Sequence, residues 1–186
     1  MKTLTLIIIS ILFSTLFNTA TNAQERIKSS IVEMESNEIV LRHEFTVQAT
    51  LAEVWTAYTT SEGWEAWAVE HASVDLRTNG RILTNYNPEG EIGDDETLEI
   101  KIINYVPYRL LTLQSVIPDN FPDFMKENEA GFYNIIEFTE LESKLTKVIS
   151  YGLGYDDTPE YRNILAFFSE ANVQAFTSLI DYLESE

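Results

Sequence analysis

Apolar and polar residues alternate along a segment near the start of the chain, between residues 39 and 47. Residues two apart share one face of a β-strand. One face of this segment is apolar apart from a single histidine, and it carries Leu41, His43, Phe45 and Val47. The alternation therefore predicts a half-buried strand whose apolar side includes His43.

Further alternating or apolar runs follow, and turn residues separate them. Asn87-Pro88-Glu89-Gly90 is a strong turn signal, and Pro107 interrupts two runs that have the pattern of a hairpin. These signals predict a loop or short helix over 117–130 and strands over 71–76, 81–86, 97–105, 110–116, 132–141 and 145–154.

Two short helices are expected directly after the first strand. Thr50 and Glu53 have the spacing of a capping box, which marks a helix start. We expect Gly63 to separate this helix from a second short segment over 64–67.

The chain ends with the longest expected helix. Thr158 followed by Pro159 is typical of a helix start, and apolar residues recur at three- and four-residue steps over 159–184. A helix of this length extends about 39 Å, which is enough to cross a small sheet.

The order of these elements indicates an α+β fold, because strands and helices do not alternate. An antiparallel sheet with one apolar face must bury that face, and only the final helix is long enough to cover it. We expect a curved antiparallel sheet of about six or seven strands wrapped around the C-terminal helix. The two short helices would close one end of the groove between sheet and helix, which is a natural ligand pocket.

The first 23 residues are predicted to be a signal peptide. A positive start at Lys2 precedes an apolar run over 4–17, and Thr21-Asn22-Ala23 supplies the small residues of a cleavage site. The run of about 14 residues is short of the roughly 20 that span a bilayer, so stable membrane insertion after cleavage is not expected. We therefore expect a periplasmic or secreted protein with a tether over 24–37 and one domain over 38–186.

The charge balance excludes several classes of partner and chemistry. With 12 Lys and Arg against 30 Asp and Glu, the net charge is −18, which disfavours nucleic acid and anionic membranes. The absence of cysteine excludes disulfides, thiolate metal sites and thiol nucleophiles. An acidic loop over 89–96 could supply oxygen ligands to calcium, but its spacing fits no EF-hand, and a solvated loop is the favoured interpretation. No metal or cofactor is expected.

Several motifs resemble the SRPBCC or START-like superfamily, in the branch similar to activators of heat-shock-protein ATPase. They are Val47-Gln48-Ala49, Ala52-Glu53-Val54-Trp55, Trp64-Glu65-Ala66-Trp67, the segments 75–80 and 102–110, and the closing helix. Together they span roughly residues 39–184. The chain departs from the family pattern at Thr50, where proline is usual, and at Asn79, where a second glycine is usual.

The resemblance implies a helix-grip fold around a hydrophobic cavity. Lipid carriers, plant allergens, polyketide cyclases and co-chaperones use this scaffold, so the fold alone does not select a function.

His43 is the most informative candidate for ligand contact, because a titratable group on an apolar face can orient a ligand or move a proton. A histidine bonded within the core is the structural alternative. Aromatic residues of the expected groove are suited to line a pocket, although core packing explains them equally well. The candidate ligand-binding set is His43, Phe45, Trp64, Trp67, Tyr86, Tyr105 and Phe168.

Three functions remain open at this point. The favoured one is an exported, non-catalytic protein that binds a small hydrophobic or amphipathic ligand between sheet and helix, since no nucleophile–base pattern occurs in the sequence. The alternatives are a co-chaperone-like protein-binding module, which the family suggests, and a cofactor-free cyclase- or hydrolase-like enzyme that uses His43.

Overall fold

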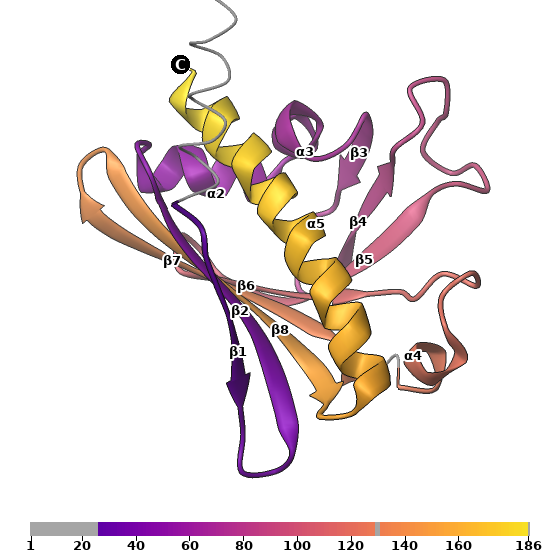
Figure 1. The fold of residues 1–186 in the computed structure, drawn as a ribbon. Helices are drawn as coiled ribbons and strands as arrows, with labels where there is room; N and C mark the ends of the chain where they lie inside the picture. Colours follow the sequence, from indigo (N-terminus) through magenta and orange to yellow (C-terminus); the bar gives the residue numbers. More distant parts are fainter. Residues whose placement is uncertain (1–25, 129–130, 186) are drawn as a thin grey trace, which may run out of the picture.

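The computed structural model describes residues 26–128 and 131–185, so the predicted signal peptide over 1–23 lies outside the described residues. Within them, an eight-stranded antiparallel sheet in the order β1-β2-β8-β7-β6-β5-β4-β3 curves beneath one long helix (Figure 1). The strands are β1 (Lys28–Glu33), β2 (Glu38–Val47), β3 (His71–Val74), β4 (Gly80–Asn85), β5 (Leu98–Val106), β6 (Leu110–Ser115), β7 (Tyr133–Glu142) and β8 (Leu145–Asp156). The helices are α2 (Leu51–Thr59), α3 (Ser61–Trp67), α4 (Asp123–Glu127) and α5 (Pro159–Glu184).

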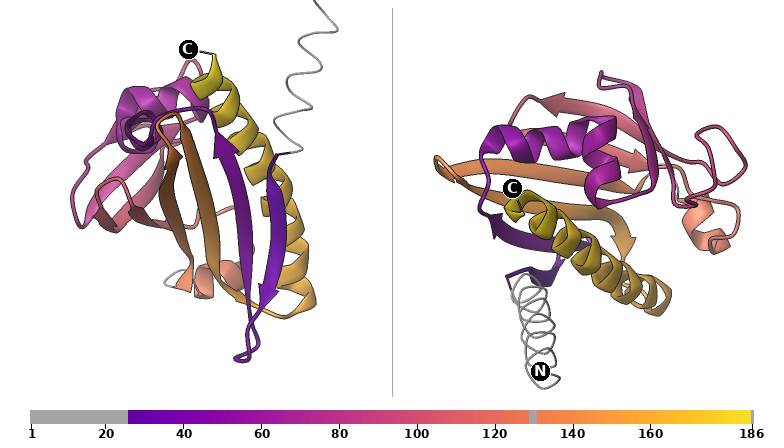
Figure 2. Two further views of the ribbon diagram at one scale, coloured as in Figure 1. Left: turned by 90° about the vertical axis from the view of Figure 1, so that its left-hand side faces the viewer. Right: turned by 90° about the horizontal axis from the view of Figure 1, so that it is seen from above.

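This arrangement confirms the expected α+β helix-grip architecture. Helix α5 has the 26 residues expected of it, and the side chain of Thr158 caps its start by accepting a hydrogen bond from the Tyr161 backbone. Side chains such as Leu165, Leu179 and Ile180 are completely buried. Figure 2 shows α5 lying along the concave side of the sheet, with α2 and α3 beside its C-terminal part.

The sheet has one strand that the sequence did not indicate. Residues 24–37 were expected to form a tether, but Lys28–Glu33 within them pair with β2 as the edge strand β1. All six residues of β1 are exposed. A strand exposed on both faces needs no apolar alternation, which explains why the sequence pattern did not reveal it.

The two short helices follow the predicted capping signals but divide at a different residue. Thr50 accepts a hydrogen bond from the Glu53 backbone, and Glu53 accepts one from the Thr50 backbone at 2.7 Å, which completes the capping box. The helices meet at Thr60, and Gly63 lies inside α3. Gly63 permits close packing, because a Cβ there would lie 2.5 Å from the carbonyl oxygen of Thr56.

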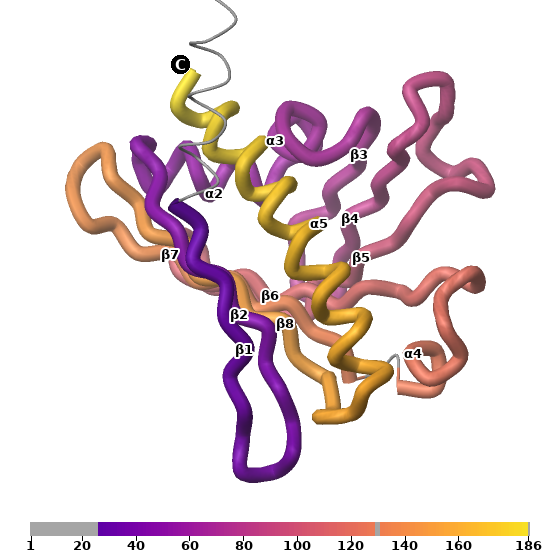
Figure 3. Tube along the Cα trace, in the orientation of Figure 1, coloured from indigo at the N-terminus to yellow at the C-terminus, as the bar shows by residue number. Residues whose placement is uncertain are grey.

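The hydrophobic core consists of two clusters along α5. The large cluster joins buried side chains of α2, α3 and the C-terminal half of α5 to those of the sheet. It includes Phe45, Tyr58, Phe138, Phe176 and Leu179. The small cluster lies near α4 and the start of α5 and consists of Ile39, Leu41, Met125, Phe132, Tyr155, Tyr161 and Leu165. Figure 3 shows how α5 passes over the sheet from α4 toward α2 and so spans both clusters.

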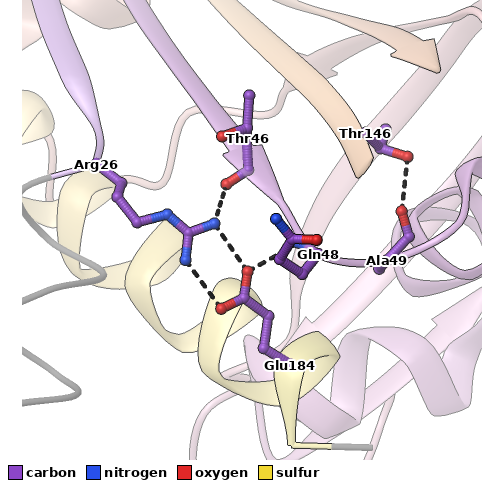
Figure 4. A network of polar contacts seen from close by, with 6 residues as sticks. All are labelled: Arg26, Thr46, Gln48, Ala49, Thr146 and Glu184. Atoms are coloured by element: carbon purple, nitrogen blue, oxygen red, sulfur yellow. Dashed lines mark hydrogen bonds and ion pairs between the residues drawn. The ribbon is translucent and has the colours of Figure 1, made fainter. Parts of the chain in front are cut away.

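An ion pair fixes the C-terminal end of α5 to the sheet (Figure 4). The guanidinium of Arg26 donates to both carboxylate oxygens of Glu184, at 2.9 and 2.8 Å, and to the carbonyl of Thr46. Glu184 also accepts from the backbone of Gln48 at 2.8 Å. Burial alone would raise the pKa of Glu184, but the hydrogen bonds from Arg26 and Gln48 outweigh it and hold the pKa below its ordinary value.

Candidate functional site

His43 lies at the junction of the two core clusters. On β2 it stands between Leu41 of the small cluster and Phe45 of the large cluster, with only 1% of its surface exposed. Its ring packs edge-on against Phe176 of α5, with 5.4 Å between ring centroids, and Phe176 also packs on Phe45 at 5.1 Å. The predicted inward orientation of His43 and Phe45 is therefore confirmed.

The imidazole of His43 is a deeply buried polar group with the backbone of Ser169 on α5 as a polar neighbour. Among the described residues, neither Nδ1 nor Nε2 has a hydrogen bond of acceptable geometry. Burial lowers the pKa of His43, and the backbone of Ser169 on α5 opposes this shift only in part. The ring is therefore neutral at pH 7, with one donor and one acceptor nitrogen. An unpaired buried polar group destabilises a fold by about 1–3 kcal/mol, so a ligand that bonded it would recover part of that energy.

Small residues lie beside His43 on the sheet, and the stretch of α5 between its two buried parts is more exposed. Ser150 of β8 is the direct cross-strand partner of His43, and Gly152 follows it on the same face. Along α5, residues 166–175 are all exposed or half-buried, between buried Leu165 and buried Phe176. Helix α5 is thus most deeply buried at the two clusters and least buried over residues 166–175.

Tyr58 of α2 is a second buried polar group without a partner among the described residues. Its side chain is 2% exposed and packs against Trp67 and Phe138, with ring centroids 5.4 and 5.3 Å away. Burial raises the pKa of its phenol well above the ordinary value, so the hydroxyl stays protonated. The sequence did not single out Tyr58, because a tyrosine on an amphipathic helix face does not differ from a core residue.

The tryptophans of α3 use their polar atoms within the protein. The indole nitrogen of Trp64 donates to the carbonyl of Tyr58 at 2.8 Å, and that of Trp67 donates to the carbonyl of Ala57 at 3.0 Å. The two rings also pack on each other at 5.5 Å. These bonds fix α3 against α2, so Trp64 and Trp67 form a wall of the core near Tyr58.

The remaining predicted ligand-contact residues lie in three different places. Tyr105 is half-buried and packs on Trp55, with 6.2 Å between ring centroids. Phe168 belongs to the edge of the small cluster and stacks on Phe121 at 6.3 Å. Tyr86 is 61% exposed and follows the end of β4, so it does not join the others.

Residues 117–128 cover the small cluster at the α4 end of the grip. Met125 of α4 is 1% exposed, and Phe124 packs edge-on against Tyr161 of α5 at 4.9 Å. The expected loop or short helix is therefore a cover over the start of α5.

The acidic loop after β4 is organised by hydrogen bonds within the chain. The carboxylate of Asp94 accepts from the backbones of Glu91 and Glu96 and from the side-chain amide of Asn85. These bonds, the one from Glu91 foremost, lower the pKa of Asp94. Among the described residues, no group of three or more acidic or histidine side chains is placed to hold a metal ion.

A hollow of about 380 Å³ lies on the other face of the sheet, over β4 and β5. Its lining includes Arg77, Asn79, Gly80, Arg81, Glu99 and Lys101. Arg81 and Lys101 alternate with buried Ile82 and Ile102, so they project from the face turned away from the core. No pattern in the sequence indicates this group of residues, because only the register of β4 against β5 brings them together.

No helix among the described residues combines the length and apolar character that crossing a membrane requires.

Comparisons with known proteins agree with this architecture. The family model described as Activator of Hsp90 ATPase homolog 1-like protein matches residues 48–184. A search of curated proteins found no match. Among solved structures, the Aha1 dimer from Colwellia psychrerythraea is 19% identical with a TM-score of 0.62, covering 78% of this chain and 96% of that chain.

Two other solved structures are similar at the same level. A protein from Rhodobacter sphaeroides is 16% identical with a TM-score of 0.63, covering 87% of this chain and 99% of its own. CalU16 from Micromonospora echinospora is 16% identical with a TM-score of 0.58, covering 84% of this chain and 83% of its own. At these identities the likeness concerns the fold.

Proposed function

The chain belongs to the Activator of Hsp90 ATPase homolog 1-like family, and from this premise we propose that it is an exported, non-catalytic binding protein. Its ligand is a small hydrophobic or amphipathic molecule held between the sheet and α5. The fold and the family are compatible with such a module, and the buried position of His43 supports a binding place beside this residue.

The observation that supports this proposal is the deeply buried imidazole of His43, whose nitrogens make no well-formed hydrogen bond among the described residues. Phe45 and Phe176 supply apolar contact beside it, and the two ring nitrogens supply one donor and one acceptor. A ligand that fits has an apolar body and one neutral polar group, such as a hydroxyl or carbonyl. A charged head group does not fit, because His43 is neutral and its surroundings would strip a charge of water without compensation.

Access to His43 requires movement of the middle of α5. Phe176 covers the ring from one side, and residues 166–175 form the stretch of the helix that is least buried. The two core clusters and the Arg26–Glu184 ion pair hold the ends of the helix in place. Ligand uptake therefore bends or lifts the helix centre while its ends stay attached.

Catalysis is not part of the proposal, because a general base needs an orienting partner within hydrogen-bond reach. Among the described residues, neither nitrogen of His43 makes a hydrogen bond of acceptable geometry, and its polar neighbour on α5 is a backbone group, that of Ser169. A His43→Ala variant that retained ligand binding but lost a turnover measured for the wild type would contradict this part of the proposal.

Native mass spectrometry of the protein purified from its own host tests the ligand. We expect a co-purifying mass that denaturation releases, and saturable binding of the neutral probe N-phenyl-1-naphthylamine by the emptied protein. His43→Leu should lose the co-purified molecule, whereas His71→Gln, at the other histidine of the chain, should retain it. Absence of both the co-purified mass and probe binding would refute the proposal.

Export rests on the sequence of residues 1–23 and is tested separately. Cell fractionation should place the protein outside the cytoplasm, and N-terminal sequencing should begin at Gln24. A full-length cytoplasmic chain would contradict export.

The second candidate function is a co-chaperone-like module, which the family match favours. It predicts direct association with a chaperone ATPase of the host and an increase in its ATP turnover. Such an effect, together with a cytoplasmic full-length chain, would favour this function over ligand binding.

A further inference from the structure

We propose that the hollow over β4 and β5 is a second binding site, which takes a small organic anion with a carboxylate or phosphate group and a short apolar part. It lies on the opposite face of the sheet from His43 and is independent of the ligand proposed for the interior.

Two like charges lie directly opposite each other in the lining of the hollow. Arg81 of β4 and Lys101 of β5 are cross-strand partners in the antiparallel ladder, so their side chains start from adjacent positions on one face. Like charges directly opposite each other destabilise a sheet. In a chain with 12 basic and 30 acidic residues, three basic residues line this one hollow, and the third is Arg77. Arg77 and Arg81 have carboxylate partners, and Lys101 also has an interaction within the chain, so an anion would compete with these partners for the three basic side chains.

A turn with a constrained backbone lies between Arg77 and Arg81. Asn79 adopts a left-handed φ of 59°, and its backbone donates to the carbonyl of Ile102 at 2.9 Å. Gly80 donates to the carbonyl of Arg77 at 2.8 Å, and a Cβ on Gly80 would lie 2.0 Å from the carbonyl oxygen of Asp75. Only glycine fits there, so the turn fixes the backbone positions of Arg77 and Arg81 beside the hollow before any ligand arrives.

The arginines of the hollow already have carboxylate partners, with which an anion would compete. Glu99 lies 3.8 Å from Arg81, a long ion pair whose side chains are 37% and 60% exposed, and Asp75 pairs with Arg77 at 2.7 Å on the rim. Exposed pairs of this kind stabilise little, so a ligand can compete for the arginines. Ile103 adds apolar lining, and the volume is near the lower end of that of small-molecule sites.

The test is a titration followed by NMR amide shifts, with phenyl phosphate and benzoate as separate probes. We expect saturable shifts confined to residues 75–81 and 99–103, and the tighter probe identifies the head group. Arg81→Gln should weaken binding about fivefold, which corresponds to one exposed charge pair. Glu99→Gln should tighten it by a similar factor, because it removes the competing carboxylate.

Lys144→Gln is the matched control, since it removes one exposed positive charge elsewhere in the chain. Its affinity should equal that of the wild type. The proposal is overturned if neither probe saturates, if Arg81→Gln binds as the wild type does, or if Lys144→Gln weakens binding as much as Arg81→Gln.

Discussion

The centre beneath α5 and the hollow over β4 and β5 occupy opposite faces of one sheet and are built in opposite ways. Beneath α5, a neutral imidazole lies deeply buried beside Phe45 and Phe176, and the proposed ligand can reach it only if the helix moves. Over β4 and β5, basic side chains line a surface hollow, and the proposed ligand has to compete there with exposed carboxylates. We therefore expect the proposed interior site to select by shape and dehydration, and the proposed surface site to select by charge.

The first prediction concerns closure of the interior and has the largest expected effect. Leu179 of α5 is completely buried in the large cluster, so Leu179→Ala should lower the free energy of unfolding by about 3–5 kcal/mol. Phe167→Ala, on the same helix but 59% exposed, should change it by less than about 0.5 kcal/mol. Urea denaturation measures both, and equal losses would mean that α5 does not close the interior as described.

The second prediction uses pH to test the neutral imidazole. Because the pKa of His43 is lower in the folded than in the unfolded protein, the unfolded chain takes up a proton first as pH falls below its ordinary value of 6.5. Wild-type stability should therefore fall below pH 6.5, by at most about 1.4 kcal/mol per pH unit for one proton, until the folded ring also titrates.

His43→Leu removes this proton uptake and the unpaired polar group together. The variant should be at least as stable as the wild type at pH 7 and more stable by about 1–2 kcal/mol at pH 5. His71→Gln is the control and should follow the wild type. A His43→Leu protein that lost stability in parallel with the wild type would show that the imidazole is not held neutral.

The third prediction concerns the attachment of the end of α5. Glu184→Gln should lower stability by about 1 kcal/mol at pH 7, because it weakens the partly exposed pair with Arg26. The folded pKa of Glu184 is depressed, so its contribution is present above the ordinary carboxyl pKa of 4.5 and is lost as pH falls below it. The difference between variant and wild type should therefore disappear near pH 3.

Glu184→Gln also separates the two sites, since only the interior depends on helix movement. Uptake of N-phenyl-1-naphthylamine should become faster, and binding of phenyl phosphate over β4 and β5 should not change. Glu170→Gln, an exposed carboxylate on the same helix, is the control for charge. Altered phenyl phosphate affinity in Glu184→Gln alone would mean that the two sites are coupled.

Local signals predicted the parts of the fold that local chemistry determines. The capping box at Thr50 and the start of α5 at Pro159 lie where their residue types indicated. The inward orientation of His43 followed from the two-residue period of a strand. Thr50 and Asn79 are the two departures from the family pattern, and both suit their positions in the structure. Thr50 completes the cap of α2, and Asn79 tolerates a left-handed φ.

The features that were not predicted from the sequence depend on contacts between distant segments of the chain. The edge strand β1 carries no apolar pattern, and Gly63 marks close helix packing where a helix boundary was expected. Tyr86 was expected to point inward, and it is an even number of residues from buried Ile82. Strand β4 ends at Asn85, so the two-residue period does not extend to Tyr86, which is exposed. The pairing of Arg81 with Lys101 follows from strand register, which the sequence does not specify.

The last prediction compares the two sites through ionic strength and has the smallest expected effect. Raising NaCl from about 20 mM to about 0.5 M shortens the screening length from roughly 20 Å to less than 5 Å. Phenyl phosphate binding over β4 and β5 should weaken about threefold to fivefold, because its energy comes from exposed charges. Binding of neutral N-phenyl-1-naphthylamine beneath α5 should be unchanged, since no charge is exchanged there. Parallel titrations by NMR and fluorescence measure the salt dependence of the two affinities. Equal salt dependence would place both probes at one site and would contradict the distinction between a shape-selective interior and a charge-selective exterior.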